Sequence, residues 1–188
     1  LKFGVSFAQS FLNQGHALVH VFTDGSVSVS HGGVEMGQGL HTKIRQVAAE
    51  EFGIPLELVK VRETSTESTA NTAPTSASSG YDLNAGAVKD ACKQIKENIK
   101  DYYSKFQSGE ISWKDCCNQA WFGRCRLSAA GHYKHPIPGF NFTTQTGQPF
   151  YYYACSAIVI RVMVDKLTGL SQVLKAELVV DVGQSINP

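Results

Sequence analysis

A glycine-rich segment is the first part of this sequence that could do chemistry. The glycines of residues 32–39 surround Gln38 and lead into an apolar helical pattern that begins at Leu40. Glycine lets the backbone approach a ligand closely, and a helix N-terminus presents free N–H groups with a partial positive charge, so the segment suits a phosphate or another anion. It is not a P-loop, because no Lys-Ser/Thr pair follows the glycines, and it lacks the last glycine of the dinucleotide-binding motif. A glycine-rich turn that serves only the backbone is the alternative.

A hydroxyl-rich segment is the second candidate. Ten of the 17 residues from Thr64 to Gly80 are Ser or Thr, and none is basic or aromatic. Small side chains leave backbone N–H groups accessible, and hydroxyls add donors without charge. Because both segments lead into helices, they could converge on one polyanionic ligand. A flexible surface loop is the alternative.

The histidines and cysteines show no metal or nucleophile pattern. The six histidines are scattered without a convincing i, i+4 pair, so each is expected to be a surface or packed residue. The five cysteines include no CxxC pair and no zinc spacing, and we expect reduced thiols.

Composition limits the classes of protein that remain. The chain has 188 residues, a formal net charge of +1, 43% hydrophobic residues and 18% charged residues. The apolar share argues against disorder, and the low charge indicates surfaces covered by other protein. Near-neutrality gives no drive toward nucleic acid or membranes, and no apolar run reaches the roughly 20 residues of a membrane span. Residues 1–188 are expected to be a fragment truncated at both ends.

The elements that must position these residues indicate an α+β fold, with mixed sheets and interspersed helices. A mixed-sheet α/β fold is the alternative, because strands and helices do not alternate regularly. Asp24-Gly25 predicts a hairpin in which both turn residues have positive φ. A sub-boundary is expected near 135–148. Strands are expected at 3–11, 17–22, 26–30, 59–62, 126–132, 150–164 and 171–181, and helices at 40–52, 84–103 and 112–122.

Several runs, in order along the chain, resemble one protein family. The most specific is Glu-Met-Gly-Gln-Gly-Leu-His-Thr-Lys at 35–43. The others include Lys-Phe-Gly-Val-Ser-Phe at 2–7, Phe-Leu-Asn-Gln at 11–14, Asn-Thr-Ala-Pro-Thr-Ser-Ala-Ser at 71–78 and Asp-Val-Gly-Gln-Ser-Ile-Asn-Pro at 181–188. They look like the molybdopterin-binding region of the xanthine dehydrogenase and aldehyde oxidase family, the molybdenum hydroxylases, and are closest to the xanthine dehydrogenases.

The resemblance implies a molybdenum–molybdopterin cofactor. Gln38 matches a glutamine that hydrogen-bonds an oxo ligand of molybdenum, and so reaches the metal only through that ligand. Met36 and Gly37 match neighbouring cofactor contacts. The segment that holds the pterin and its phosphate is matched by Thr75, Ser76, Ala77, Ser78, Ser79 and Gly80.

The resemblance also implies a substrate side. Phe7 matches an aromatic residue that packs on the substrate ring, Leu12 a residue of the access channel, and Ala77 a small residue at the substrate face. Three departures bear on purine specificity. Ala8 stands where the xanthine enzymes usually have a Thr, Ser76 where they usually have an Ala, and Tyr152-Tyr153 where Gly-Val is expected.

The implied reaction is hydroxylation of purines such as hypoxanthine and xanthine. In the family, a Mo–OH deprotonated by a Glu attacks carbon, a hydride passes to Mo=S, and electrons leave through 2Fe-2S clusters to FAD. The base Glu is expected beyond Pro188, so no catalytic residue is expected in these 188 residues, and the fragment alone is expected to be inactive. An aldehyde oxidase-like hydroxylase of aldehydes and N-heterocycles is one alternative. A non-catalytic cofactor-binding fragment is another.

The expected partners are a small heteroaromatic substrate and the rest of the parent chain, with no nucleic acid and no membrane. The resemblance further implies a homodimeric parent in the cytoplasm, with the peroxisome as the alternative location.

Overall fold

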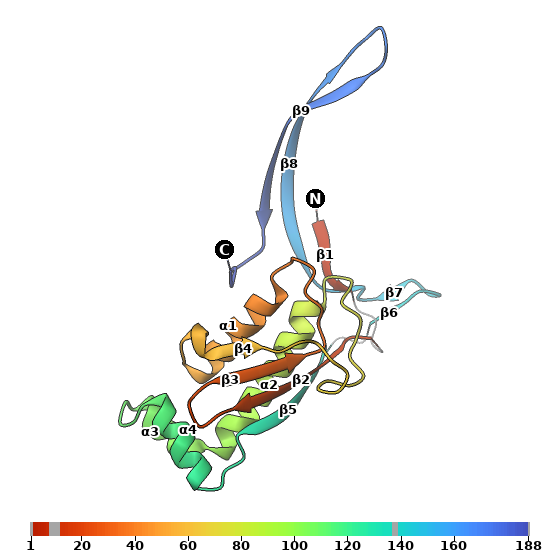
Figure 1. Cartoon of the computed structure of the whole chain (residues 1–188). Coiled ribbons are helices and arrows are strands. Elements are labelled where there is room, and N and C mark those ends of the chain that lie inside the picture. Colours follow the sequence, from red (N-terminus) through yellow and green to blue (C-terminus); the bar gives the residue numbers. More distant parts are fainter. Residues whose placement is uncertain (1, 8–11, 137–138, 188) are drawn as a thin grey trace.

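The computed structural model describes residues 2–7, 12–136 and 139–187. Helices and two main sheets alternate irregularly along the chain (Figure 1). The elements are β1 (Lys2–Phe7), β2 (Gln14–Val21), β3 (Val27–His31), α1 (Leu40–Phe52), the 3₁₀ turn η1 (Leu56–Leu58), β4 (Val59–Val61), α2 (Gly80–Asn98), α3 (Lys100–Gln107), α4 (Trp113–Phe122), β5 (Ser128–Lys134), β6 (Phe140–Asn141), β7 (Thr146–Gly147), β8 (Phe150–Val164) and β9 (Ser171–Asp181).

A four-stranded sheet of order β4-β3-β2-β5 forms the base of the fold. The predicted hairpin joins β2 to β3, but of its two turn residues only Gly25 has a positive φ, of 86°. The prediction that both are left-handed is therefore wrong. The Asp24 carboxylate accepts hydrogen bonds from the Ser26 N–H at 2.9 Å and the Ser26 hydroxyl at 2.7 Å, which closes the turn without a second left-handed residue.

Helices α1 and α2 pack on the four-stranded sheet and form the core with it. Alternate residues of β2, including Ala17, Val19 and Val21, are buried, as the period of a strand requires. Strand β5 lies very close to α2, since a Cβ on Gly131 would collide with the carbonyl oxygen of Ala87. This approach fixes the position of the N-terminal half of α2, which leads out of the hydroxyl-rich segment.

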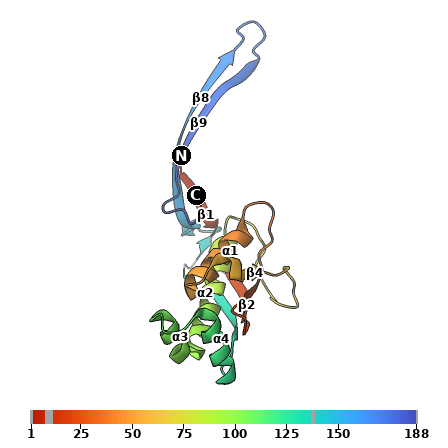
Figure 2. The same cartoon turned by 60° about the vertical axis from the view of Figure 1, so that its left-hand side comes forward.

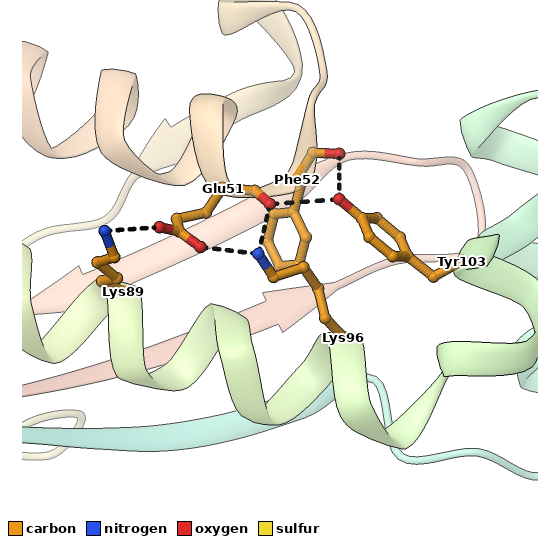
Figure 3. Close-up of polar contacts among 5 residues, drawn as sticks. All are labelled: Glu51, Phe52, Lys89, Lys96 and Tyr103. Carbon is orange, nitrogen blue, oxygen red and sulfur yellow. Dashed lines mark hydrogen bonds and ion pairs between the residues drawn. The ribbon is translucent and has the colours of Figure 1, made fainter. Parts of the chain in front are cut away.

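The C-terminal end of α1 is held by side chains of α2 and α3 (Figure 3). The Lys96 ammonium donates to the Glu51 carboxylate at 2.7 Å and to the Glu51 carbonyl at 2.8 Å. The Tyr103 hydroxyl donates to the carbonyls of Glu51 and Phe52, at 3.3 and 3.2 Å. Lys89 adds an ion pair with Glu51 at 3.2 Å. These donors satisfy carbonyls that a helix end leaves free, so the orientation of α1 is fixed at this end.

The helix predicted over 84–103 differs from the observed one. Helix α2 begins four residues earlier, at Gly80, and it breaks at Ile99, where φ is −112°, before α3 begins. The helix predicted over 112–122 is confirmed, and the Ser112 hydroxyl caps it by accepting the Asp115 N–H. All five cysteines are free, and burial raises the pKa of Cys92 and Cys117 to about 12.

A second sheet, of order β1-β8-β9, carries a long hairpin that extends away from the helices (Figures 1 and 2). Strands β8 and β9, both predicted, pair antiparallel from Cys155–Asp181 to Val164–Ser171. The strand predicted over 3–11 is β1, which ends at Phe7, and residues 8–11 lie outside the described residues. The predicted loop at 135–148 contains the small β6–β7 ladder and connects the two main sheets. The sub-boundary there stays a prediction.

Candidate cofactor site

The loop between β3 and α1 is closed by the carboxylate of Glu35. One carboxylate oxygen accepts the N–H groups of Gly37 and Gly39, at 2.9 and 3.0 Å, and the other accepts the N–H of His41 at 2.9 Å. These bonds, led by that from His41, hold the pKa of Glu35 below its ordinary value. Glu35 thus occupies the N–H of His41 in the first turn of this helix, and the role of the segment in binding an external anion stays a prediction. Glu35 itself supplies the negative charge that this helix end favours.

Gln38 is built into the same loop. Its amide oxygen accepts the Met36 N–H at 2.6 Å, and its Nε2 donates to the Val34 carbonyl at 2.9 Å. Gly37 and Gly39 on either side have φ of 97° and 76°, a region that favours glycine. Nε2 carries two protons, so one N–H of the exposed amide stays available to a ligand while the loop remains closed.

A buried histidine also holds the loop between β3 and α1. His31 is fully buried, and its Nδ1 accepts the Gly33 N–H at 3.0 Å. The ring proton therefore lies on Nε2, which donates to Nδ1 of His41 at 3.0 Å. Burial, with a smaller contribution from His41, lowers the pKa of His31 to about 4. His31 is thus neutral at physiological pH, and as a packed residue it agrees with the sequence expectation.

The hydroxyl-rich segment lies against this loop. Thr75 Oγ1 accepts the Val34 N–H at 2.9 Å, and the Thr64 hydroxyl donates to the Gly33 carbonyl at 2.8 Å. Further along, Ser79 donates to the Ser76 carbonyl through its N–H and its hydroxyl. The glycine-rich and hydroxyl-rich segments are thus joined by hydrogen bonds within the chain itself.

Two consecutive non-glycine residues in this segment have left-handed backbones. Ala77 has a φ of 54° and Ser78 a φ of 58°, and the next residue, Ser79, is right-handed at φ −98° and ψ −12°. A left-handed residue followed by a right-handed one points successive N–H groups toward one spot, a geometry that binds anions. Each left-handed non-glycine residue costs about 1–2 kcal/mol, and such strain is concentrated at functional sites.

A cavity of about 360 Å³ lies between the loop and this segment. Gln38 and Ser78 both line it, together with Lys43, Asp82 and Tyr152. Of the predicted cofactor residues, those that line it are Met36, Gln38, Thr75, Ser76, Ala77, Ser78 and Gly80. Gly37 shapes the loop without lining the cavity.

A second cavity, of about 250 Å³, lies on the other side of residues 76–77. Leu12 and Ala77, both predicted on the substrate side, line it together, and so does Ser79. Ser76 and Ala77 line both cavities and form the wall between them. The side chain of Phe7 and the whole of Ala8 lie outside the described residues.

Sequence reasoning missed a buried polar network beside these cavities. The Ser6 hydroxyl lies 2.6 Å from Nε2 of His135, and the side chains of Ser6 and Tyr152 both act to lower the pKa of the nearby Asp82 carboxyl group. Burial raises the pKa of Asp82, and burial together with the nearby Asp82 raises the pKa of Tyr152 to about 12. Ser6 and His135 are 129 residues apart, so no local pattern could have indicated the pair.

Two other kinds of site are absent from the described residues. In residues 2–7, 12–136 and 139–187 there is no group of three or more His, Cys, Asp or Glu that could hold a metal ion. None of the helices in these ranges is long and apolar enough to cross a membrane.

Comparison with known proteins decides the family. All 188 residues match the family model described as the molybdopterin cofactor-binding domain. The chain belongs to this family. The domain is 47% identical over 187 residues to xanthine dehydrogenase/oxidase of Mus musculus, and 46% identical to xanthine dehydrogenase of Emericella nidulans. Each match covers 100% of this chain and 14% of the relative, so the chain spans about one seventh of these proteins.

Solved structures confirm the α+β fold of the domain. Quinoline 2-oxidoreductase from Pseudomonas putida matches 100% of the chain and 27% of its own, with a TM-score of 0.79 at 19% identity. Aldehyde oxidoreductase from Desulfovibrio desulfuricans matches 97% of the chain and 19% of its own, with a TM-score of 0.74 at 20% identity. The resemblance to xanthine dehydrogenases and the α+β assignment are thereby confirmed.

Proposed function

We propose that the cavity between the Gln38 loop and residues 75–80 holds the molybdopterin cofactor of a purine-hydroxylating parent enzyme. The observation that carries this proposal is the left-handed pair Ala77 and Ser78. Two adjacent strained residues persist only where the surrounding structure holds them, and here both line the cavity that Gln38 also lines.

The residues present fit such a group. The free N–H of Gln38 and the turn at 77–80 offer hydrogen-bond donors from opposite sides, and Lys43 adds a positive charge for a phosphate. Asp82 offers an acceptor, because its buried Oδ2 has no hydrogen-bond partner among the described residues. When bound, the cofactor supplies the two-electron oxidation in which a ring carbon of the substrate gains oxygen from water.

The substrate takes the other side of the wall. Leu12 and Ala77 line the second cavity, where a methyl side chain at position 77 leaves room for a flat ring. Phe7, at the end of β1, would stack on that ring. No residue of these 188 is assigned as the base, so turnover depends on the rest of the parent chain, which would also carry the 2Fe-2S clusters and FAD.

The test uses the full-length parent protein and compares two glutamine variants. Gln38→Leu should lower bound molybdenum and pterin, measured by plasma mass spectrometry and pterin fluorescence, by about tenfold. Gln119→Leu, an exposed position on α4, is the matched control and should bind as the wild type does. A wild-type protein without molybdenum, or equal loss in both variants, contradicts the proposal.

Oxidation of aldehydes and N-heterocycles is a second candidate, favoured by Ala8. The xanthine enzymes that this sequence resembles usually have a Thr there, and a site that hydrogen-bonds its substrate owes much of its discrimination to such contacts. Ala8→Thr in the parent enzyme should raise the ratio of kcat/KM for xanthine to that for benzaldehyde by about tenfold. An unchanged ratio would show that position 8 does not set specificity.

A further inference from the structure

Lys43 brings a positive charge to the larger cavity that the rest of the described chain leaves unpaired. It lies in the first turn of α1, and its side chain is partly buried. Among the residues that the structure describes, its ammonium makes no ion pair and no hydrogen bond. An ammonium has three donors, and a partly buried cation gives up water that only an acceptor can replace. Lys43 therefore keeps its donors available to a ligand.

Asp82 lines the same cavity but does not take up this charge. Burial raises the pKa of the Asp82 carboxyl group, and attraction to Lys43 is the smallest of the effects that act against that rise. An ion pair with Lys43 would hold that pKa below its ordinary value. The charge of Lys43 is therefore not neutralised by the acidic residue beside it.

The ring of Tyr81 holds the ammonium in place. The Nζ of Lys43 lies over this ring, 5.6 Å from its centroid, which is within the reach of a cation–π interaction. Tyr81 directly follows Gly80 at the start of α2 and lines the larger cavity with Lys43. The contact therefore joins the first turns of the two helices that border this cavity.

Tyr81 also lines a third cavity, of about 200 Å³, which contains carboxylates. Glu50 and Glu51 line that cavity, and Glu51 is already paired with Lys89 and Lys96. Glu50 follows Lys43 by two helical turns, so both lie on the same side of α1. Burial, then Asp82 and Glu50, raises the pKa of Tyr81, so the charge of Glu50 reaches the ring. A smaller residue at position 81 would leave the Lys43 ammonium free to turn toward Glu50.

We infer that Tyr81 is a positioning residue that keeps the Lys43 ammonium in the larger cavity, available to the phosphate of the cofactor. This inference rests on the proposed function. It has a specific consequence, because the effect of Tyr81 on cofactor binding must act through Lys43. A residue that only packed at the start of α2 would matter equally with or without Lys43.

The experiment compares Tyr81→Leu with Tyr81→Phe in the full-length parent enzyme. Bound molybdenum and pterin are measured after dialysis against rising sodium chloride, because salt weakens the attraction between an ammonium and a phosphate. Tyr81→Leu removes the aromatic face and should lower cofactor affinity about threefold. Tyr81→Phe keeps the face and should bind as the wild type does. Lys93→Met, at an exposed position of α2, is the control and should also bind normally.

A double variant tests whether Tyr81 acts through Lys43. Lys43→Met should lower cofactor affinity about tenfold, and Tyr81→Leu should add no further loss to it. Further loss in the double variant, wild-type affinity in Tyr81→Leu, or a lower thermal midpoint of cofactor-free Tyr81→Leu would overturn the inference. A wild-type enzyme without molybdenum would instead overturn the proposed function, so the two failures are distinguishable.

Discussion

At the scale of single residues, the wall between the two cavities depends on backbone conformation more than on side chains. Ala77 and Ser78 are left-handed without being glycine, although glycine would adopt that conformation at no steric cost. The segment is therefore less stable than a glycine-containing one would be. A residue that lowers stability is commonly retained where function needs it.

Replacement of Ala77 by Gly should stabilise the domain. Left-handed strain of about 1–2 kcal/mol is relieved, and the greater entropy of unfolded glycine offsets about 0.5–1 kcal/mol, so the free energy of unfolding should rise by about 0.5–1 kcal/mol. Urea denaturation measures this change. The control is Ala73→Gly, at a position outside the positive-φ residues, which should destabilise the domain by about 0.5 kcal/mol. Equal effects at both positions would contradict the strain argument.

At the scale of elements, the loop between β3 and α1 depends on Glu35 and His31, whose roles the sequence analysis did not predict. Glycines predicted the loop and the helix after it, and both are confirmed. The carboxylate of Glu35 accepts N–H groups up to six residues later in the chain, and His31 is buried by tertiary packing. Both roles were therefore missed. An acidic residue just before a helix was the available signal for Glu35.

His31 should make the stability of the domain depend on pH. Its pKa is lowered from 6.5 to about 4 by burial, so the unfolded chain binds a proton more readily than the folded one. The neutral ring contributes full stability above pH 6.5, and that stability should fall by roughly 2–4 kcal/mol as the pH drops to 4. Unfolding at several pH values should show this slope in the wild type. His31→Gln should flatten it, and an equal slope in both would contradict the assignment.

The helical register explains why the elements were predicted better than their ends. Ile95, Ile99 and Tyr102 continue one apolar stripe, so the pattern predicts one helix, whereas the backbone breaks at Ile99. The Ser79 hydroxyl donates to the Ser76 carbonyl and does not cap the helix. The start of α2 at Gly80 was therefore missed. The contacts of α1 with α2 and α3 join distant residues, and no local pattern encodes them.

The Lys96 contact should contribute measurably to the packing of α1. Its ammonium bonds both a carboxylate and a helix-end carbonyl, and the two charged side chains are only 24% and 14% exposed. Lys96→Met should lower the free energy of unfolding by about 1–2 kcal/mol. Lys100→Met, whose pair with Glu97 is 65% and 73% exposed, is the matched control and should leave the free energy of unfolding almost unchanged. A similar loss of unfolding free energy in both variants would show that burial of the Lys96 pair is unimportant.

At the scale of the whole molecule, the β8–β9 hairpin has few contacts of its own to bury its apolar residues. Val159 and Val179 are 70% and 74% exposed, and many neighbours on both strands are similarly exposed. Large exposed apolar surfaces mark contacts with other protein. The low charge of the sequence indicated such a surface, but it could not say that one hairpin carries it.

The isolated 188-residue chain should therefore self-associate. Val159 and Val179 lie diagonally across the two strands, because Val159 pairs with Glu177 and Val179 with Ala157. The double variant Val159→Lys/Val179→Lys should shift the chain toward monomer in size-exclusion chromatography, as charged residues protect sheet surfaces from pairing. The double variant Ser171→Lys/Gln172→Lys, at exposed polar positions of the same hairpin, is the control and should leave the elution volume unchanged. A monomeric wild type would contradict this prediction.

The closure of the Gln38 loop by its own side chains bears on the order in which the holoenzyme is assembled. The side chains of Glu35, Gln38 and His31 accept hydrogen bonds from N–H groups of the loop. The surface proposed to bind the cofactor is therefore formed before the cofactor binds. Folding can then precede cofactor binding, and the folded protein without cofactor would be the species that receives it. A cell short of molybdenum would accumulate intact apoprotein, ready for activation, instead of unfolded chains destined for degradation.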